Sequence, residues 1–279
     1  MKLMVKIVAC MAVMGCPNLQ AQKRPAPLPP IPTSVTFAPA NPQLPAIFAV
    51  GDSTATRWGP QIAELFDPAK VNLILAAAAG RSTRSYRNEG IWARVLAKVR
   101  PNDIVIIELG GNDGLPLDEP ERWRGTLRGI GDETQDVYNT LIHEQEVVHT
   151  YGWYLRQYVR ETKAKGAKPI LLSVTPRDTW IGGHMETTVS GYPKFAREVA
   201  SQEHCDFADV TAIAIAGYEL IGEEKTQTLF EADKAWHVTE LGAKLNAEWI
   251  VQGLKGLPDA PITAFLSPKG QALAPVATP

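Results

Sequence analysis

The 279-residue sequence has little of what would link it to a membrane or a nucleic acid. Its 28 Lys and Arg nearly balance its 30 Asp and Glu, giving a net charge of -2, whereas nucleic-acid-binding domains usually carry a basic excess. Beyond the N-terminus, no apolar run approaches the roughly 20 residues that a membrane-spanning helix needs. Apolar residues make up 45% of the chain, which is enough for the core of one α/β domain with tails.

Cysteine is also scarce, with 3 in the whole chain, and two of them fall in a segment that looks like an export signal. Lys2 and Lys6 precede an apolar stretch over 7–14, and cleavage is expected after Ala21. Residues 13–16 also form a weak lipoprotein box with Cys16 as the lipid acceptor. After cleavage past residue 21 only Cys205 remains, so an intramolecular disulfide is excluded. We therefore expect an exported, periplasmic or extracellular protein that is a monomer, with lipidation as the alternative.

Proline marks the boundaries of the folded region. A proline-rich linker follows the signal over 22–44, a single domain is expected over 45–257, and the proline- and alanine-rich tail over 258–279 is expected to be loose. Within the domain, apolar runs alternate with helical patterns. Strands are predicted over 47–50, 72–76, 104–109, 169–174 and 206–209. Helices are predicted over 58–65, 82–99, 148–165, 192–201, 212–220 and 240–254.

The apolar runs lack polar alternation, which is typical of strands covered on both faces. Helices between such strands predict βαβ units, and hence an α/β fold with a parallel five-stranded sheet in a three-layer α/β/α sandwich. The segment 118–146 departs from this pattern, because it is polar, glycine-containing and weakly periodic. It is either a surface loop or a loop that shapes a binding site, since it starts directly after the third strand.

Three strand ends carry the residues of chemical interest. Ser53 follows the first strand, Gly80 follows the second, and Asn112 follows the third. In an open parallel sheet such ends line one crevice. A serine, a glycine and an asparagine in one crevice suit acyl transfer, with the backbone N–H groups of Ser53 and Gly80 and the Asn112 amide as donors to an oxyanion.

A serine hydroxyl needs a neighbouring base to act as a nucleophile. Of the 5 histidines, His237 is the best candidate, because it precedes the last helix and has Asp233 upstream on the same loop. The others fit the role less well: His143, His149, His184 and His204.

Each of these residues also has a structural interpretation. Asp52 and Ser53 could simply cap a helix, and Gly80 could be an ordinary turn glycine. The residues around Asn112 are also typical of a generic turn. Their occurrence in order at successive strand ends favours the catalytic interpretation. The chain has no G-x-S-x-G motif, which argues against an ordinary α/β-hydrolase.

Together, Gly51-Asp52-Ser53, Gly80, Gly-Gly-Asn-Asp over 110–113 and the terminal Asp233…His237 resemble the SGNH (GDSL-type) hydrolase superfamily. The run 79–86 (Ala-Gly-Arg-Ser-Thr-Arg-Ser-Tyr), with Thr54 and the segment 148–154, is similar to rhamnogalacturonan acetylesterases of carbohydrate esterase family 12. The resemblance covers roughly 47–254. It implies a flavodoxin-like fold and removal of acetyl groups from pectic sugar without a metal or other cofactor.

By position, the resemblance implies Ser53 as nucleophile, His237 as base, and Ser53, Gly80 and Asn112 as oxyanion donors. Two features depart from the family pattern. Gly111 stands where a side chain is usual, and Asp233 lies four rather than three positions before His237, with Lys234 at the expected place. Either the extra residue bulges out and leaves Asp233 in reach, or His237 works with a backbone carbonyl.

Arg81 and Trp236 are further candidates for contacts with a sugar. Trp236 either stacks on the sugar or merely covers the loop, and Trp58 and Trp180 raise the same question. The leading hypothesis is a serine esterase acting on acetylated plant cell-wall polysaccharide. The alternatives are an esterase for acetylated xylan, a lipid or a thioester, and a carbohydrate-binding protein that has lost catalysis.

Overall fold

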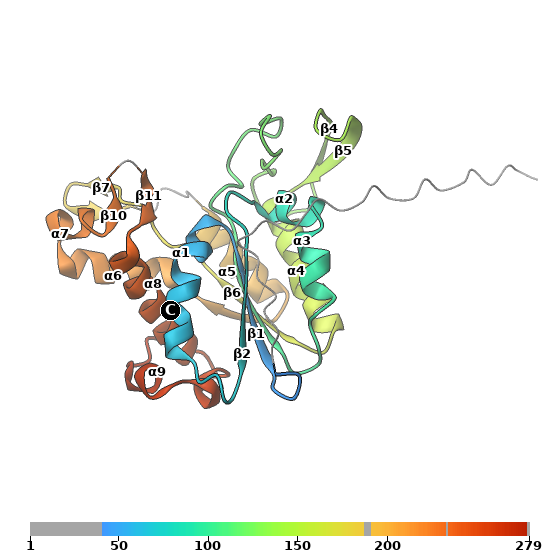
Figure 1. Ribbon diagram of the computed structural model, residues 1–279. Helices are drawn as coiled ribbons and strands as arrows, with labels where there is room; N and C mark the ends of the chain where they lie inside the picture. Colours follow the sequence, from blue (N-terminus) through green and yellow to red (C-terminus); the bar gives the residue numbers. More distant parts are fainter. Residues whose placement is uncertain (1–40, 187–190, 233, 278–279) are drawn as a thin grey trace, which may run out of the picture.

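The computed structural model describes residues 41–186, 191–232 and 234–277. At its centre lies one five-stranded sheet with the strand order β2-β1-β3-β6-β9, and every pair of neighbours is parallel (Figure 1). The strands are β1 (Ala46–Gly51), β2 (Asn72–Ala77), β3 (Ile104–Glu108), β6 (Lys168–Leu172) and β9 (Asp206–Ala208). The order reverses between β1 and β3, and in such sheets the crevice at the carboxyl ends of these strands is the usual place for a ligand.

Helices cover both faces of the sheet, which confirms the three-layer α/β/α arrangement (Figure 1). One face packs against α2 (Thr83–Asn88), α3 (Ile91–Leu96), α4 (Tyr151–Ala164) and α5 (Tyr192–Gln202). The other packs mainly against α1 (Ser53–Ile62) and α8 (Glu240–Lys255). Because both faces are covered, β1 and β3 are buried along their whole length, as expected of parallel strands.

The remaining elements lie around this sandwich. The helical ones are η1 (Ala63–Leu65), α6 (Val210–Ile221), α7 (Glu223–Gln227), η2 (Thr263–Phe265) and α9 (Pro268–Ala272). Three antiparallel ribbons pair β4 (Thr134–Asn139) with β5 (Glu144–His149), β7 (Trp180–Ile181) with β8 (His184–Met185), and β10 (Phe230–Glu231) with β11 (Lys234–Val238). None of these ribbons was predicted, because their strands are short or rich in polar residues.

Two expectations from the sequence are wrong. The single helix over 82–99 is divided into α2 and α3, because Gly90 adopts a left-handed conformation with φ of 70°. The tail from residue 258 is not loose over its described part: Ile262 and Leu266 are fully buried, and Lys255 Nζ donates to the Gln271 carbonyl at 2.8 Å. The composition of this segment, rich in proline and alanine, suggested a loose tail. A few apolar side chains nevertheless anchor it to the core.

Several expectations concern residues outside the described ranges: the signal over 1–21, Cys16, most of the linker over 22–44, and Asp233. Within the described ranges, no helix is both long and apolar enough to cross a membrane. The same ranges contain no group of three or more His, Cys, Asp or Glu side chains arranged to hold a metal ion.

Candidate active site

Ser53 stands at the junction of the first strand and the first helix. β1 ends at Gly51, Asp52 caps α1 by accepting from the Thr54 N–H at 3.0 Å, and Ser53 is the first helical residue. The backbone N–H of such a residue has no acceptor within its own helix, so it is available to a ligand. The turn requires glycine at position 51, because a Cβ there would lie 2.4 Å from the Cβ of Ala55.

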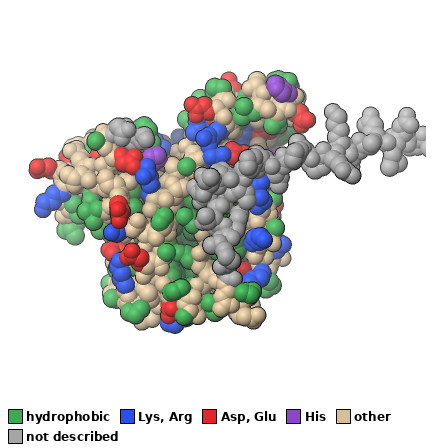
Figure 2. Space-filling view, viewed as in Figure 1, with side chains coloured by type: hydrophobic (Ala, Val, Ile, Leu, Met, Phe, Trp, Pro, Cys, Tyr) green, Lys and Arg blue, Asp and Glu red, His purple; other side chains and the backbone are tan. Residues whose placement is uncertain are grey.

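The four described residues that the sequence analysis assigned to nucleophile, base and oxyanion donors line one pocket of about 520 Å³: Ser53, Gly80, Asn112 and His237. The first three follow β1, β2 and β3, so the pocket lies at the carboxyl edge of the sheet. In the surface view, basic side chains gather at a notch between the protrusion that carries β4 and β5 and the lobe that carries β10 and β11 (Figures 1 and 2). The fold therefore brings together strand ends that are far apart in the sequence.

Gly80 and Asn112 supply polar groups to this pocket in different ways. Gly80 has φ of +72°, a conformation that side-chain-bearing residues rarely adopt. Asn112 Nδ2 donates to the backbone carbonyl of Arg81 at 3.1 Å and to Asp52 Oδ2 at 3.2 Å. Both hydrogens of the amide are thus engaged within the protein, and a ligand oxygen must replace one of these bonds.

Asp52 is more than a helix cap. Its side chain is buried beside Gly111 and Asn112, and burial raises its pKa against the lowering effect of the bonds from Thr54. A Cβ at position 111 would lie 2.6 Å from Asp52 Oδ2. The glycine that departs from the family pattern therefore makes room for this carboxylate.

Two more carboxyl groups are buried behind the pocket. Glu108, at the end of β3, accepts from the Trp58 indole and from the Thr175 N–H at 2.8 Å, and burial together with the Asp52 charge raises its pKa to about 7. Asp113 accepts from the Thr83 N–H at 3.1 Å, and burial likewise raises its pKa to about 7. These groups hold the strand ends in place from within the protein.

His237 lies in β11, within an irregular part of the β10–β11 ribbon. Phe230 pairs with Val238 but Glu231 pairs with Lys234, so residues 235–237 form a bulge between the two pairs. The imidazole is 17% exposed, and its Nδ1 lies 3.8 Å from Glu231 Oε2. Glu231 Oε1 in turn forms an ion pair of 2.6 Å with Arg57.

The other predicted candidates have different positions. Trp236 lines the pocket and is half exposed, whereas Trp58 is completely buried in the core. Arg81 pairs with Glu89 at 2.7 Å and does not line the pocket, which it reaches only through the carbonyl bonded to Asn112. Asp233, the predicted partner of His237, lies outside the described residues. None of the other four histidines lines the pocket.

Three arginines that the sequence analysis did not single out line the same pocket. Arg124 is engaged by Glu119 and Glu121, at 2.9 and 3.2 Å. By contrast, no carboxylate in the described part of the chain lies within ion-pair distance of Arg122 or Arg177. Their backbone contacts are Arg122 to the Ala79 carbonyl at 3.3 Å and Arg177 to the Gly111 carbonyl at 2.8 Å. Burial, with Arg81 and Arg124 nearby, lowers the pKa of Arg122.

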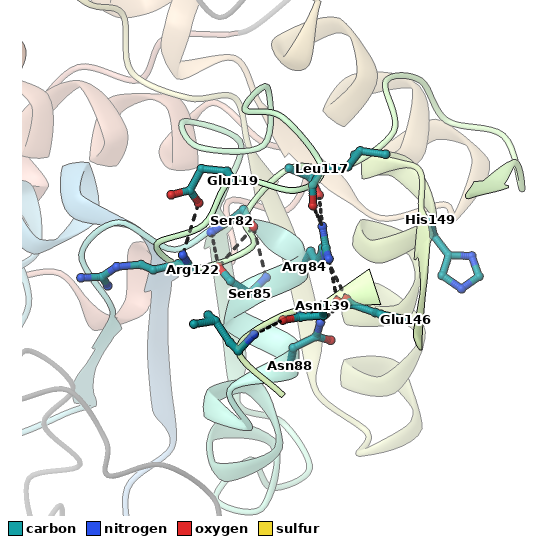
Figure 3. Close-up of polar contacts among 12 residues, drawn as sticks. Ser82, Arg84, Ser85, Asn88, Leu117, Glu119, Arg122, Asn139, Glu146 and His149 are labelled. Carbon is teal, nitrogen blue, oxygen red and sulfur yellow. Dashed lines mark hydrogen bonds and ion pairs between the residues drawn. The ribbon is translucent and has the colours of Figure 1, made fainter. Parts of the chain in front are cut away.

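Arg122 and Arg124 belong to the polar segment 118–146, so part of this segment lines the pocket. Arg84 of α2 anchors this segment from below. It is completely buried, pairs with Glu146 at 2.6 Å, and donates to the Leu117 carbonyl at 2.9 Å. Figure 3 shows Arg84 between these two partners, with His149 pointing away from the cluster. The segment is therefore tied to α2, the helix that follows Gly80.

Comparison with known proteins identifies relatives over most of the chain. Residues 34–245 match the GDSL-like Lipase/Acylhydrolase family. A rhamnogalacturonan acetylesterase of Emericella nidulans is 30% identical over 207 residues, which are 72% of this chain and 81% of that protein. A probable rhamnogalacturonan acetylesterase of Bacillus subtilis, YesY, is 26% identical over 226 residues, which are 76% of this chain and 94% of that protein. The crystal structure of Bacillus subtilis YxiM has the same fold, with a TM-score of 0.61 and 23% identity over 76% of this chain and 56% of that protein.

Proposed function

The chain belongs to the GDSL-like lipase/acylhydrolase family and is a carboxylic ester hydrolase, and on that premise we propose that it removes acetyl groups from a uronate-containing plant cell-wall polysaccharide of the rhamnogalacturonan type. The observation that carries this proposal is the pocket shared by Ser53, Gly80, Asn112 and His237. It joins a nucleophile, a base and oxyanion donors in one place, as acyl transfer requires.

In the proposed mechanism, Ser53 Oγ attacks the acetyl carbonyl carbon while His237 Nε2 takes the hydroxyl proton. The resulting oxyanion accepts hydrogen bonds from the N–H groups of Ser53 and Gly80 and from Asn112 Nδ2, which gives up one of its two internal bonds. Collapse of the intermediate transfers the proton from His237 to the departing sugar oxygen and leaves an acetyl ester on Ser53. Water then attacks this ester while His237 takes its proton. The second intermediate collapses, His237 returns the proton to Ser53 Oγ, and acetate leaves with the serine hydroxyl restored.

The arginines favour a substrate that carries carboxylates. Arg122 and Arg177 both line the pocket and form no ion pair with a carboxylate among the described residues, although the Arg177 charge has a lowering effect on the pKa of Asp52. Arg122 contacts the Ala79 carbonyl beside Gly80, and Arg177 contacts the Gly111 carbonyl. Guanidinium groups bind planar carboxylates through paired hydrogen bonds. Acetylated xylooligosaccharides without acidic substituents offer no such group, whereas galacturonate residues of pectin offer one on each sugar. Acetylated pectin is therefore a better match to the charge of this pocket.

Replacing Ser53 with Ala tests the nucleophile. We expect acetate release from acetylated rhamnogalacturonan to fall to background, because no hydroxyl remains to form the acetyl-enzyme. Acetate is measured enzymatically across acetylated pectin, acetylated xylan and longer-chain esters, and a fluorophosphonate probe should label the wild type but not the variant. Turnover that survives in the variant would sink the assignment of Ser53. A preference for acetylated xylan or for long-chain esters would instead assign the enzyme to a different substrate class.

The Arg122→Gln substitution tests the charge preference. Loss of one charge-assisted contact should raise KM for acetylated galacturonate oligosaccharides about ten-fold, with a smaller change for the uncharged ester 4-nitrophenyl acetate. Raising the salt concentration should weaken the wild type in the same selective way. The control is Lys98→Gln, which removes a positive charge from an exposed site that does not line the pocket. Equal effects of Arg122→Gln on both substrates would contradict the proposal.

The cellular setting follows from the N-terminal pattern. Residues 1–21 support export with cleavage after Ala21, and Cys16 supports lipidation as the alternative. Either route brings a monomeric enzyme to extracellular or periplasmic polysaccharide. Mass spectrometry of the mature N-terminus, after expression with the native leader, distinguishes a chain that starts at residue 22 from one that starts at a lipidated Cys16.

A further inference from the structure

We propose that Glu231 is the residue that positions His237, and that Arg57 holds the Glu231 carboxylate in place. This inference rests on the proposed function, because it concerns how His237 is kept ready to accept the Ser53 proton. It assigns to Glu231 the part for which the sequence pattern predicted Asp233.

The two oxygens of the Glu231 carboxylate face different partners. Oε1 pairs with the Arg57 guanidinium at 2.6 Å, and Oε2 lies 3.8 Å from Nδ1 of His237. The carboxylate is 24% exposed and the imidazole 17%, so both are partly shielded from water. Contacts between a catalytic base and its neighbours are often long in an empty site and shorten when substrate binds. On this proposal, Glu231 accepts a hydrogen bond from Nδ1–H once this contact shortens.

Arg57 links this pair to the nucleophile. It lies on α1 four residues after Ser53, about one helical turn along the same helix. The helix that carries the nucleophile at its first position thus also carries the cation that binds Glu231, and α1 packs directly against β11. Any displacement of the β10–β11 ribbon from α1 stretches the Arg57–Glu231 ion pair. The relative placement of Ser53 and His237 is therefore supported from both sides.

The β10–β11 ribbon brings a carboxylate six positions before the histidine close to it. In a regular antiparallel ribbon with Phe230 opposite Val238, the residue opposite Glu231 would be His237 itself. In this chain Glu231 pairs with Lys234 instead, and His237 belongs to the three-residue bulge between the pairs. Bulges of this kind re-aim a side chain, and they are common beside active sites. Here the bulge keeps His237 beside Glu231 while the ribbon shifts its register.

The chemistry of the step requires such a carboxylate. When Nδ1 carries its hydrogen towards Glu231, Nε2 has a free lone pair and can accept the Ser53 proton. The positive imidazolium that results is then stabilised by the negative charge of Glu231, which itself remains unprotonated. A glutamine at this position keeps the size of the side chain but removes the charge, and its NH₂ group can face Nδ1 and favour the wrong tautomer.

The test measures steady-state hydrolysis of 4-nitrophenyl acetate by the full chain and four variants. Glu231→Gln should lower kcat by at least about 100-fold with little change in KM, because the substrate does not contact Glu231. Glu231→Asp should recover roughly ten-fold of that loss, since it restores a charge at a slightly longer distance. Glu224→Gln, an exposed carboxylate on α7, serves as the matched control. Asp233→Asn is measured alongside, and thermal melting checks that each variant folds.

The pH profile separates positioning from a purely structural role. Charged groups of several elements lie around the His237 site: Glu231 from β10, Arg57 from α1, and Arg177 and Asp52 from other walls of the pocket. Removing the Glu231 charge alone should shift the acid limb of kcat/KM about one unit to lower pH. Loss of folded protein would reduce the amplitude without moving this limb.

The outcomes are distinguishable. A loss above ten-fold in Glu231→Gln, with partial recovery in Glu231→Asp and a shifted acid limb, supports the inference. A loss below ten-fold, or an unmoved acid limb, overturns it, and a large loss in Asp233→Asn would then return the role to the aspartate. In either case Ser53→Ala remains inactive if the proposed function holds. Activity that survives in Ser53→Ala defeats the proposed function itself.

Discussion

Three carboxyl groups, Asp52, Glu108 and Asp113, are buried where β1 and β3 end. Each accepts hydrogen bonds from neighbouring donors, yet burial is the largest influence on all three and raises their pKa values. Burying several acidic groups beside a candidate site lowers the stability of the folded protein when those groups are charged. The arrangement makes the stability of the protein depend on pH in a direction that can be measured.

Glu108→Gln tests this dependence. A carboxyl group whose pKa rises on folding from 4.5 to about 7 favours the folded state below pH 4.5, and that contribution is lost as the pH rises to about 7. The loss in the wild type is on the order of 3 kcal/mol for this group. Glutamine does not titrate, so urea unfolding of the variant should show a correspondingly flatter fall in stability across this range. A pH dependence equal to that of the wild type, or to that of Glu224→Gln, would contradict the assignment to Glu108.

Single residues in and beside the pocket differ in how well the sequence revealed them. Ser53, Gly80 and Asn112 directly follow apolar strands, and a parallel sheet brings such ends together, so their meeting could be predicted. Glu231 and Arg177 could not, because their contacts depend on a ribbon register and on loop conformations that have no periodic signal. The general pattern of aspartate before histidine drew attention to Asp233, which lies outside the described residues.

At the scale of elements, regular periodicity was the most dependable signal. The five strands of the central sheet all lie within a residue or two of their predicted bounds, because continuous apolar runs correspond to strands covered on both faces. The helix expected over 82–99 shows the limit of this signal. Its apolar spacing continues through Gly90, but glycine in a left-handed conformation ends one helix and starts another.

The polar segment 118–146 shows a second limit. Its hairpin, β4 and β5, has few buried side chains. Its sequence therefore lacks the alternation of apolar and polar residues that indicates a half-buried strand. Polar contacts order it, above all Arg84 with Glu146, and Asn139 with Glu146 at 2.7 Å within the hairpin. Arg84 and Glu146 are 62 residues apart in the sequence, and no local rule predicts their contact.

At the scale of the whole molecule, the two ends of the central sheet have different surroundings. The carboxyl edge carries the pocket with the hairpin and the β10–β11 ribbon around it. The opposite end is covered by the C-terminal segment, in which Ser267 N–H donates to the Leu65 carbonyl at 3.0 Å and Leu266 forms a bridge with Phe66. The core that supports α1, and hence Ser53, therefore extends into a segment that looked dispensable from its composition.

This extension predicts that the C-terminal segment is needed for stability. A chain that ends at Leu257 loses Ile262 and Leu266, two completely buried side chains in the core beneath α1 and α8. Burial of two such side chains contributes about 3–6 kcal/mol, so the truncated chain should unfold at a clearly lower urea concentration. The control is a chain that ends at Ala277, which keeps all of these contacts. Leu266→Ala should cost about 2–5 kcal/mol by itself, because it opens a cavity in a site that its neighbours cannot fill. Equal unfolding midpoints for the two truncated chains would show that the segment adds nothing, and that α1 is held by the central sheet and α8 alone.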